Sequence, residues 1–319
     1  MISVIIPVYN TERYIDRCLE SVLSQSAGDI EVICVDDASV DGTPALLASW
    51  KERDSRIRVI RNPENMLESV SRNVGLEAAR GDYIYFIDSD DWIDQGYLEA
   101  MLEHACKSGL PVVINANYLQ EYESGARSTS PGDFGFIRDG VCSYPPGDIH
   151  NHFPPVVWTR LFRKDWLDAN HIRFPDTRLG GGDVTFIGLT TLLLEEGYVF
   201  RGPWYHYFQH SKSLMRNREY NYWNILGFRF LFDELNARGI PMDGLRMFFA
   251  GPIMVDSEQK FDILHSFFPK IKDAVLSRRE LYTPLDLFTL ETVCACESYG
   301  EFRQRFNPNL AASFIRKIR

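Results

Sequence analysis

Aspartates follow two apolar segments in the first hundred residues of this 319-residue chain. The segments are Val32–Val35 and Tyr83–Ile87, and the aspartates that follow them are Asp36, Asp37, Asp88, Asp90 and Asp91. Carboxylates that lie close together repel one another, so a cluster of them needs a cation or hydrogen-bond donors beside it. The pattern therefore predicts a site for a metal ion or a nucleotide.

Asp88 and Asp90 are separated by one residue, and side chains two residues apart point the same way in an extended strand. If the strand continues through them, their carboxylates suit Mg2+ or Mn2+, hard cations that take oxygen ligands and leave positions for substrate phosphates. Such a cation neutralises the charge that develops on a diphosphate leaving group.

A structural alternative is that an aspartate after a strand caps the next helix. Ser39 or Asp41 is expected to do so before Thr43, because an oxygen in that place accepts hydrogen bonds from the first N–H groups of a helix. Capping explains any one aspartate about as well as ligand binding does, but it explains the five together less well.

The segments around the aspartates alternate between two periodicities. Continuous apolar, β-branched runs predict strands at Ile2–Val8, Ile30–Val35, Ile57–Ile60, Tyr83–Ile87 and Pro111–Asn115. Helical spacing predicts the helices Glu12–Gln25, Thr43–Trp50, Ser69–Ala79 and Gln95–Lys107 between them. We therefore expect an α/β fold, a mostly parallel sheet flanked by helices, which binds its ligands at the carboxyl ends of the strands.

The rest of the chain follows a different pattern. Residues 122–155 are rich in Gly, Ser, Pro and Asp and predict a long loop region. Residues 153–232 are rich in aromatic side chains, most of which we expect in the core, with some free to stack on sugar rings. From about Tyr220 onward we expect helices, with breaks at Gly239–Pro241 and at Thr283-Pro284.

The overall composition argues against several classes of protein. There are 34 Lys and Arg against 44 Asp and Glu, and a net charge of -10 does not suit nucleic acid as a partner. The six cysteines form no C-x-x-C pair and no histidine stands at zinc-finger spacing, which argues against a structural zinc site. The sequence shows no signal-peptide pattern and no apolar run long enough to cross a bilayer, so we expect a cytoplasmic protein.

Five short motifs in the first 95 residues, taken together, resemble the family 2 glycosyltransferases. They are Ser3–Asn10, Val35–Thr43, Ser71–Leu76, Ala79–Tyr83 and Phe86–Asp91. A second block, from Trp158 through Phe174-Pro175 to Asp183, resembles the acceptor-side half of the same family. The likeness fades beyond about Leu214.

The resemblance implies a GT-A (Rossmann-like) fold over residues 1–215, with a nucleotide-binding half at 1–118 and an acceptor half at 119–215. Residues 216–319 would then form a helical C-terminal region. The implied activity is transfer of a sugar, with inversion, from a nucleoside-diphosphate sugar to an acceptor hydroxyl. We expect a UDP-linked donor and a glycan or lipid-linked acceptor, in the synthesis of a surface polysaccharide or lipopolysaccharide-type glycan.

The resemblance also implies how the nucleotide is bound. Pro7, Tyr9 and Asp37 would hold its base and ribose, and Arg72 would reach the base or the phosphates.

The same resemblance implies a metal site and a base. Asp90 would be the principal ligand of Mn2+ or Mg2+, and Asp88 would help to bind the ribose or the metal. Asp183 would be the general base that takes the proton of the acceptor hydroxyl.

Three positions depart from the family pattern. Gly182 stands where the family usually has Glu, Leu67 where a Gly commonly follows Asn65, and Phe208 where an Arg commonly follows a Tyr-x-Tyr motif. The first and third departures leave open a catalytically silent GT-A scaffold that binds nucleotide or glycan. A nucleotidyltransferase is a third hypothesis, against which we note that no Gly-rich, Lys-bearing loop follows the first strand.

Two further features each allow two interpretations. His206 and His210 either contact the diphosphate or a metal, or are hydrogen-bonded polar residues in an aromatic core. From Phe302 onward the chain carries basic residues and no acid, which suits either peripheral contact with the inner face of an anionic membrane or a solvated helix end. The basic residues are Arg303, Arg305, Arg316, Lys317 and Arg319.

Overall fold

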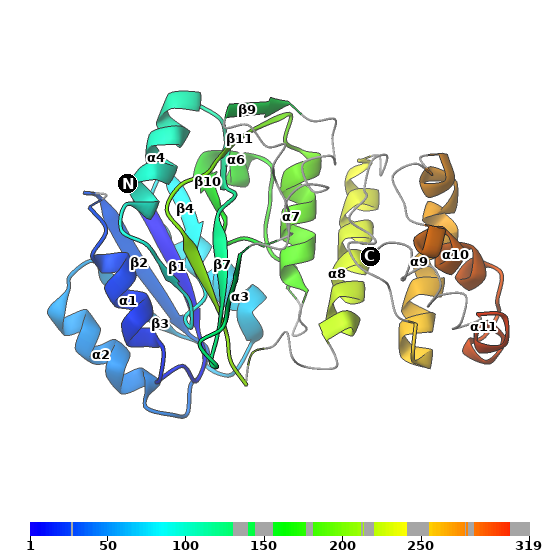
Figure 1. The fold of residues 1–319 in the computed structure, drawn as a ribbon, viewed down its shortest axis with the longest axis horizontal. Helices are drawn as coiled ribbons and strands as arrows, with labels where there is room; N and C mark the ends of the chain where they lie inside the picture. Colours follow the sequence, from blue (N-terminus) through cyan, green and yellow to red (C-terminus); the bar gives the residue numbers. More distant parts are fainter. Residues whose placement is uncertain are drawn as a thin grey trace.

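The strands of the main β-sheet come from the N-terminal two thirds of the chain (Figure 1). The computed structural model describes residues 1–26, 28–129, 140–143, 156–176, 181–211, 213, 220–240, 255–277, 279 and 284–306. Within these residues the sheet has eight strands in the order β3-β2-β1-β4-β10-β6-β11-β9. Their bounds are β1 Ile2–Val8, β2 Ile30–Asp36, β3 Ile57–Arg61, β4 Tyr83–Phe86, β6 Val112–Asn115, β9 Gly140–Ser143, β10 Arg160–Arg163 and β11 Glu196–Phe200.

The first four strands run parallel, as the sequence predicts. β1 pairs with β2 and β4, and β2 pairs with β3, all in parallel register. Their carboxyl ends therefore meet at one edge, where the loops that carry the aspartates begin. β10 runs antiparallel between β4 and β6, and β9 is antiparallel to β11. The sheet is thus mostly parallel, with two reversed strands.

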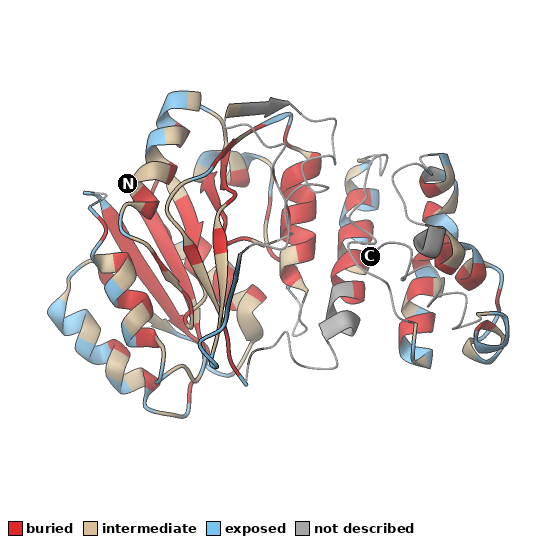
Figure 2. Cartoon of the chain, in the orientation of Figure 1, coloured by how far each residue is buried: buried red, intermediate tan, exposed pale blue. Residues whose placement is uncertain are grey.

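Helices cover both faces of this sheet. They are α1 Ile15–Leu23, α2 Thr43–Arg53, α3 Leu67–Ala78, α4 Tyr97–Ser108, α6 Lys164–Ala169 and α7 Gly182–Leu192. Ile5 of β1 packs in the apolar cluster that includes α3 and α7, whereas Val4 and Ile6 pack in the cluster that includes α1, α2 and α4. Because both faces are buried, the strand residues are apolar without alternation. Figure 2 shows the burial along the strands and α7.

Further helices follow beyond α7 among the described residues (Figure 1). They are α8 Tyr220–Arg238, α9 Glu258–Ser277, α10 Pro284–Cys294 and α11 Tyr299–Arg305. The expected breaks are confirmed, since α8 ends before Gly239, which has a φ of +64°, and α10 begins at Pro284. Leu231 of α8 packs in the same apolar cluster as Ile5 of the sheet. The helical C-terminal region is confirmed, and the domain boundaries at 118 and 215 stay predictions.

A second, smaller sheet has the order β5-β12-β7-β8, formed by Trp92–Ile93, Tyr205–Gln209, Tyr118–Tyr122 and Arg127–Thr129. The predicted loop region 122–155 is therefore wrong in part, because β8 and β9 lie within it. Both are short strands at the edge of a sheet, where pairing with one neighbour is enough. A turn at Gly125, with a φ of +81°, folds β8 back onto β7. Residues 130–139 and 144–155 lie outside the described residues.

The five cysteines whose side chains are described are all free. In the described part of the chain, no helix combines the length and the apolar character that crossing a membrane requires. Arg316, Lys317 and Arg319 of the basic tail lie outside the described residues.

Candidate active site

Three of the five aspartates at the sheet edge are buried in structural contacts. Asp36 pairs with Arg61. Asp91 is fully buried, where it accepts hydrogen bonds from the Tyr205 hydroxyl and, at 2.7 Å, from the backbone N–H of Phe208. Burial raises the pKa of the Asp91 carboxyl well above its ordinary value. For Asp36 and Asp91 the structural interpretation is therefore sufficient.

Asp37 holds the start of α3. Its carboxylate accepts hydrogen bonds from Asn62 Nδ2 at 2.7 Å and from the backbone N–H groups of Met66 and Leu67 at 2.9 and 2.8 Å. Leu67 has a φ of +65°, a conformation that favours glycine. The chain keeps the glycine-like turn at this position, and the hydrogen bonds to Asp37 offset part of its strain.

Pro7 and Tyr9 reach the same edge from β1. Tyr9 is 45% exposed, one of the few large hydrophobic side chains on the described surface. The Asp37 N–H donates to the Val8 carbonyl at 2.8 Å, which joins the ends of β1 and β2. The structure thus brings Pro7, Tyr9 and Asp37 together at the carboxyl ends of two adjacent strands, where the sequence predicts a nucleotide.

Asp88 and Asp90 are the two aspartates of this edge that stay partly exposed, at 30% and 26% of their side chains. The expectation of a continuing strand is wrong, because β4 ends at Phe86 and the Asp91 N–H closes a turn onto the Asp88 carbonyl at 3.1 Å. In the turn the two carboxylates still lie close enough for Asp90 to raise the pKa of Asp88. Proximity here comes from the turn and not from the strand.

Arg72 of α3 connects Asp88, at the edge of the sheet, with Asp183 of α7. Its buried guanidinium donates from Nη2 to Asp88 at 2.8 Å and from Nη1 to Asp183 at 2.6 Å. Burial has the largest effect on the pKa of Asp88 and raises it, Arg72 lowers it, and Asp90 and Asp183 raise it further, for a net increase. The sequence predicts that Arg72 reaches base or phosphates, and in this structure it binds two carboxylates.

Asp183 lies in the first turn of α7, where the positive end of the helix dipole favours a carboxylate. The preceding Gly182 packs tightly against α3, since a Cβ atom there would lie 2.0 Å from the hydroxyl oxygen of Ser69. On this backbone, position 182 has no room for the glutamate that the family usually has. Glycine at position 182 therefore allows α3 to pack closely against α7.

A cation lies beside Phe208, the position at which the family commonly has Arg. Arg17 of α1 places its Cζ atom 3.5 Å from the centre of the Trp92 ring and 4.6 Å from that of Phe208. Its Nη2 donates to the backbone carbonyl of Asp90 at 2.9 Å. A guanidinium on aromatic faces is favourable and is held in place by them. Arg17 therefore fixes the turn that carries the two exposed aspartates.

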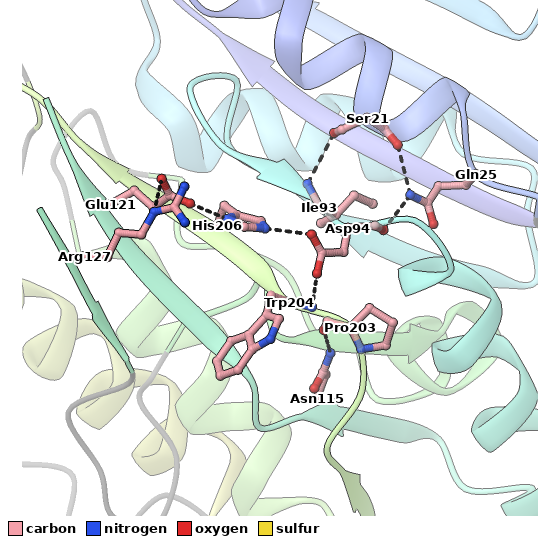
Figure 3. Close-up of polar contacts among 10 residues, drawn as sticks. All are labelled: Ser21, Gln25, Ile93, Asp94, Asn115, Glu121, Arg127, Pro203, Trp204 and His206. Atoms are coloured by element: carbon pink, nitrogen blue, oxygen red, sulfur yellow. Dashed lines mark hydrogen bonds and ion pairs between the residues drawn. The ribbon is translucent and has the colours of Figure 1, made fainter. Parts of the chain in front are cut away.

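The two histidines differ in position. His210 Nε2 lies 2.9 Å from the Asp90 carboxylate, at the site. His206 lies between two other acids, with Nδ1 2.6 Å from Glu121 and Nε2 2.8 Å from Asp94, as Figure 3 shows. These contacts join β12 to β7 and to the end of β5, so they hold the smaller sheet together.

The sequence did not single out three charged residues near the site, namely Arg17, Glu68 and Arg160. Arg160 of β10 is buried, which lowers its pKa to about 9, while the charge of Asp183 acts in the opposite direction. Such residues lie within ordinary helix and strand patterns, and no local signal marks them.

Asp88 and Asp90, with His210 beside them, have the chemistry of a Mn2+ or Mg2+ site. In the described residues no group of three or more His, Cys, Asp or Glu side chains is arranged to hold a metal by itself. Two carboxylates are nonetheless a fitting donor set, because these ions usually complete their coordination with water and substrate phosphates. The residues therefore fit a metal that binds together with a diphosphate.

Residues 3–156 match the model of the family described as Glycosyl transferase family 2. The chain belongs to the family 2 glycosyltransferases. The chain is 32% identical over 222 residues to the putative glycosyltransferase EpsH of Bacillus subtilis (strain 168), and the match covers 69% of this chain and 60% of EpsH. The chain thus matches less than two thirds of that relative's length.

Solved structures share its fold. TarS 1-349 of S. aureus in complex with UDP-GlcNAc has a TM-score of 0.74 at 21% identity, over 92% of this chain and 87% of TarS 1-349. The mannosyltransferase PcManGT of Pyrobaculum calidifontis, in complex with GDP-Man and Mn2+, has a TM-score of 0.52 at 17% identity, over 92% and 84% of the two chains. The predicted GT-A fold is therefore confirmed.

Proposed function

We propose that this chain is an inverting, metal-dependent glycosyltransferase that moves a sugar from a UDP-linked donor to a hydroxyl of a glycan or lipid-linked acceptor. The observation that carries the proposal is the pairing of Arg72 with both Asp88 and Asp183. The guanidinium of Arg72 contacts both Asp88, a carboxylate suited to the donor, and Asp183, a carboxylate suited to the acceptor. A surface polysaccharide or lipopolysaccharide-type glycan is the product we propose.

The donor is bound at the carboxyl ends of β1, β2 and β4. We assign the base and ribose of the nucleotide to Pro7, Tyr9 and Asp37, and the UDP-GlcNAc bound by TarS supports a UDP-linked donor. Asp90 and Asp88 would hold Mn2+ or Mg2+, which supplies neutralisation of charge on the departing diphosphate. The Mn2+ of PcManGT supports this choice of ion.

Asp183 acts on the acceptor. The hydroxyl oxygen of the acceptor forms a bond to the anomeric carbon, the bond from that carbon to the diphosphate oxygen breaks, and the hydroxyl proton passes to Asp183. Attack from the face opposite the diphosphate inverts the anomeric carbon. Arg72 orients Asp183 through the 2.6 Å hydrogen bond and compensates its charge while the proton is absent.

A catalytically silent scaffold is the second candidate, and Gly182 and Phe208 favour it as departures from the family pattern. It predicts binding of nucleotide or glycan without transfer. The position of Asp183 next to Arg72 argues for the enzyme, because a partly exposed carboxylate held in place by a buried guanidinium is typical of a catalytic site.

The test combines a donor panel with one substitution. We expect that UDP-sugars, and not GDP-, CDP- or dTDP-sugars, raise the Tm in the presence of Mn2+ and support transfer. Asp183→Asn should leave UDP affinity unchanged and lower transfer by about 10²- to 10⁴-fold. Asp165→Asn, at an exposed aspartate of α6, is the matched control.

Binding of UDP without transfer, unaltered by Asp183→Asn, would establish the silent scaffold instead. A wild-type protein that neither binds nor turns over any nucleoside diphosphate sugar would contradict both candidates.

A further inference from the structure

A fourth acid belongs to the cluster around Arg72. Glu68 lies in the first turn of α3, one helical turn before Arg72, and is half-buried. Arg72 attracts its charge, and Asp183, Asp88 and Asp90 repel it, in decreasing order. Its neighbour Ser69 lies against Gly182, the residue before Asp183, so the first turn of α3 lies on the acceptor side of the cluster.

The other acids near this glutamate already accept hydrogen bonds. Asp88 and Asp183 accept them from Arg72, and Asp90 lies in contact with His210. Within the described part of the chain, no group donates a hydrogen bond to Glu68. Its carboxylate oxygens therefore keep their full capacity to bind a ligand that offers hydroxyl donors.

The neighbouring residue gives a second indication of a missing ligand. Ser69 is completely buried, yet among the described residues its hydroxyl has no hydrogen-bond partner. The Nε atom of Arg72 is likewise buried and without a partner in the described chain. Buried polar atoms are rarely left unsatisfied, and a bound ligand or an ordered water would supply the partners that these two atoms do not have among the described residues.

The packing at Gly182 explains why this acid comes from α3. The Ser69 hydroxyl occupies the space that a side chain at position 182 would need. A side chain at position 182 would have to displace the Ser69 hydroxyl, whereas the first turn of α3, which contacts α7, carries a carboxylate of its own.

We propose that Glu68 binds a hydroxyl group of the acceptor sugar next to Asp183. The inference rests on the proposed function and adds a substrate-binding residue to it. The ligand class is a carbohydrate with a free hydroxyl adjacent to the one that reacts, because two neighbouring carboxylates on adjacent helices suit two neighbouring hydroxyl donors.

The charge state of Glu68 supports this assignment. Burial raises the pKa of the Glu68 carboxyl, Arg72 opposes that effect, and the aspartates Asp183, Asp88 and Asp90 add to it, for a value of about 7. A hydroxyl that donates to the carboxylate stabilises the ionised form. Acceptor binding should therefore strengthen as pH rises through 7.

The experiment uses the full chain with UDP and Mn2+ and, as probes, the methyl glycosides of glucose, galactose, mannose and N-acetylglucosamine. Binding is followed by saturation-transfer NMR and acceptor KM by transfer assays. Glu68→Gln should raise the acceptor KM by about 10-fold or more, consistent with a hydrogen bond to a charged group, and leave UDP affinity unchanged. Glu52→Gln, at an exposed glutamate of α2, is the matched control.

Two readouts separate binding from a structural role. The acceptor KM of the wild type should fall as pH rises from 6 to 8, and that of Glu68→Gln should not change with pH. Because the raised pKa makes the wild type lose stability as pH rises from about 4.5 to 7, Glu68→Gln should also gain Tm relative to the wild type over that window and level off above it.

The outcomes distinguish this inference from the proposed function. Transfer by the wild type with an unchanged acceptor KM in Glu68→Gln overturns the inference and leaves the function standing. Glycoside binding that depends on Glu68 in a protein without transfer supports the inference and overturns the function. A wild type that binds none of the four glycosides overturns the inference.

Discussion

The Nη1 atom of Arg72 donates a 2.6 Å hydrogen bond to the carboxylate of Asp183, a residue 111 positions away in the sequence. The same guanidinium binds Asp88 at 2.8 Å. A planar guanidinium offers donors in fixed directions, so it can hold two carboxylates at a defined separation. One buried residue therefore sets the separation of Asp88 and Asp183, which we propose to act on the donor and on the acceptor.

Substitutions of Arg72 can test its positive charge and the geometry of its guanidinium separately. Arg72→Lys keeps the positive charge but loses the planar group that donates to two carboxylates. We expect transfer to fall by roughly 10- to 100-fold, with UDP affinity within a few-fold of wild type. Arg72→Met should also lower the Tm, because it leaves neighbouring carboxylates without their cation. Calorimetric UDP binding and steady-state transfer measure the two effects, and wild-type kcat in Arg72→Lys would contradict the assignment.

The proposed metal site should respond to a change at His210 and not to a change at His206. His210→Ala is expected to raise the Mn2+ concentration needed for half-maximal UDP binding by about 10-fold, because His210 contacts the Asp90 carboxylate. Asp90→Asn or EDTA should abolish the Mn2+-dependent part of that binding. His206→Gln is the control, which should lower the Tm and leave the Mn2+ dependence unchanged, since His206 binds Glu121 and Asp94.

Arg17 should matter through the turn at Asp90. Arg17→Met removes the hydrogen bond to the Asp90 carbonyl and the contact with Trp92, and we expect Mn2+-dependent UDP affinity to fall by about 10-fold. Arg13→Met, at an exposed arginine just before α1, should have no effect on affinity. Equal UDP affinity in the two variants would show that the turn does not need Arg17.

The contact between α3 and α7 can be tested as a pair. Gly182→Ala should destabilise the protein by about 1–3 kcal/mol, because its Cβ would lie 2.0 Å from the Ser69 hydroxyl. Ser69→Ala removes that oxygen, so the double variant should recover part of the loss. Denaturant unfolding of all four proteins gives the coupling free energy. Additive effects would place the two residues out of contact.

Much of the fold could be predicted from periodicity alone. Apolar runs without alternation, separated by helical spacing, require a parallel sheet that is covered on both faces, and this places loops with Asp37, Asp88 and Asp90 at one edge. The edge strands β8 and β9 were missed because a short polar segment becomes a strand only where a neighbour offers a free edge.

The sequence thus determined strands β1–β4 and β6, helices α1–α4 and the edge at which the acidic residues gather, because these follow from local patterns of apolar side chains. Only the tertiary structure decided which acids are buried in structural contacts and which stay available. Asp91 and Asp90 are adjacent in sequence, yet Asp91 is buried and accepts a hydrogen bond from Tyr205, whereas Asp90 is partly exposed and contacts His210. That difference depends on where β12 lies, a contact across more than a hundred residues that no local pattern encodes.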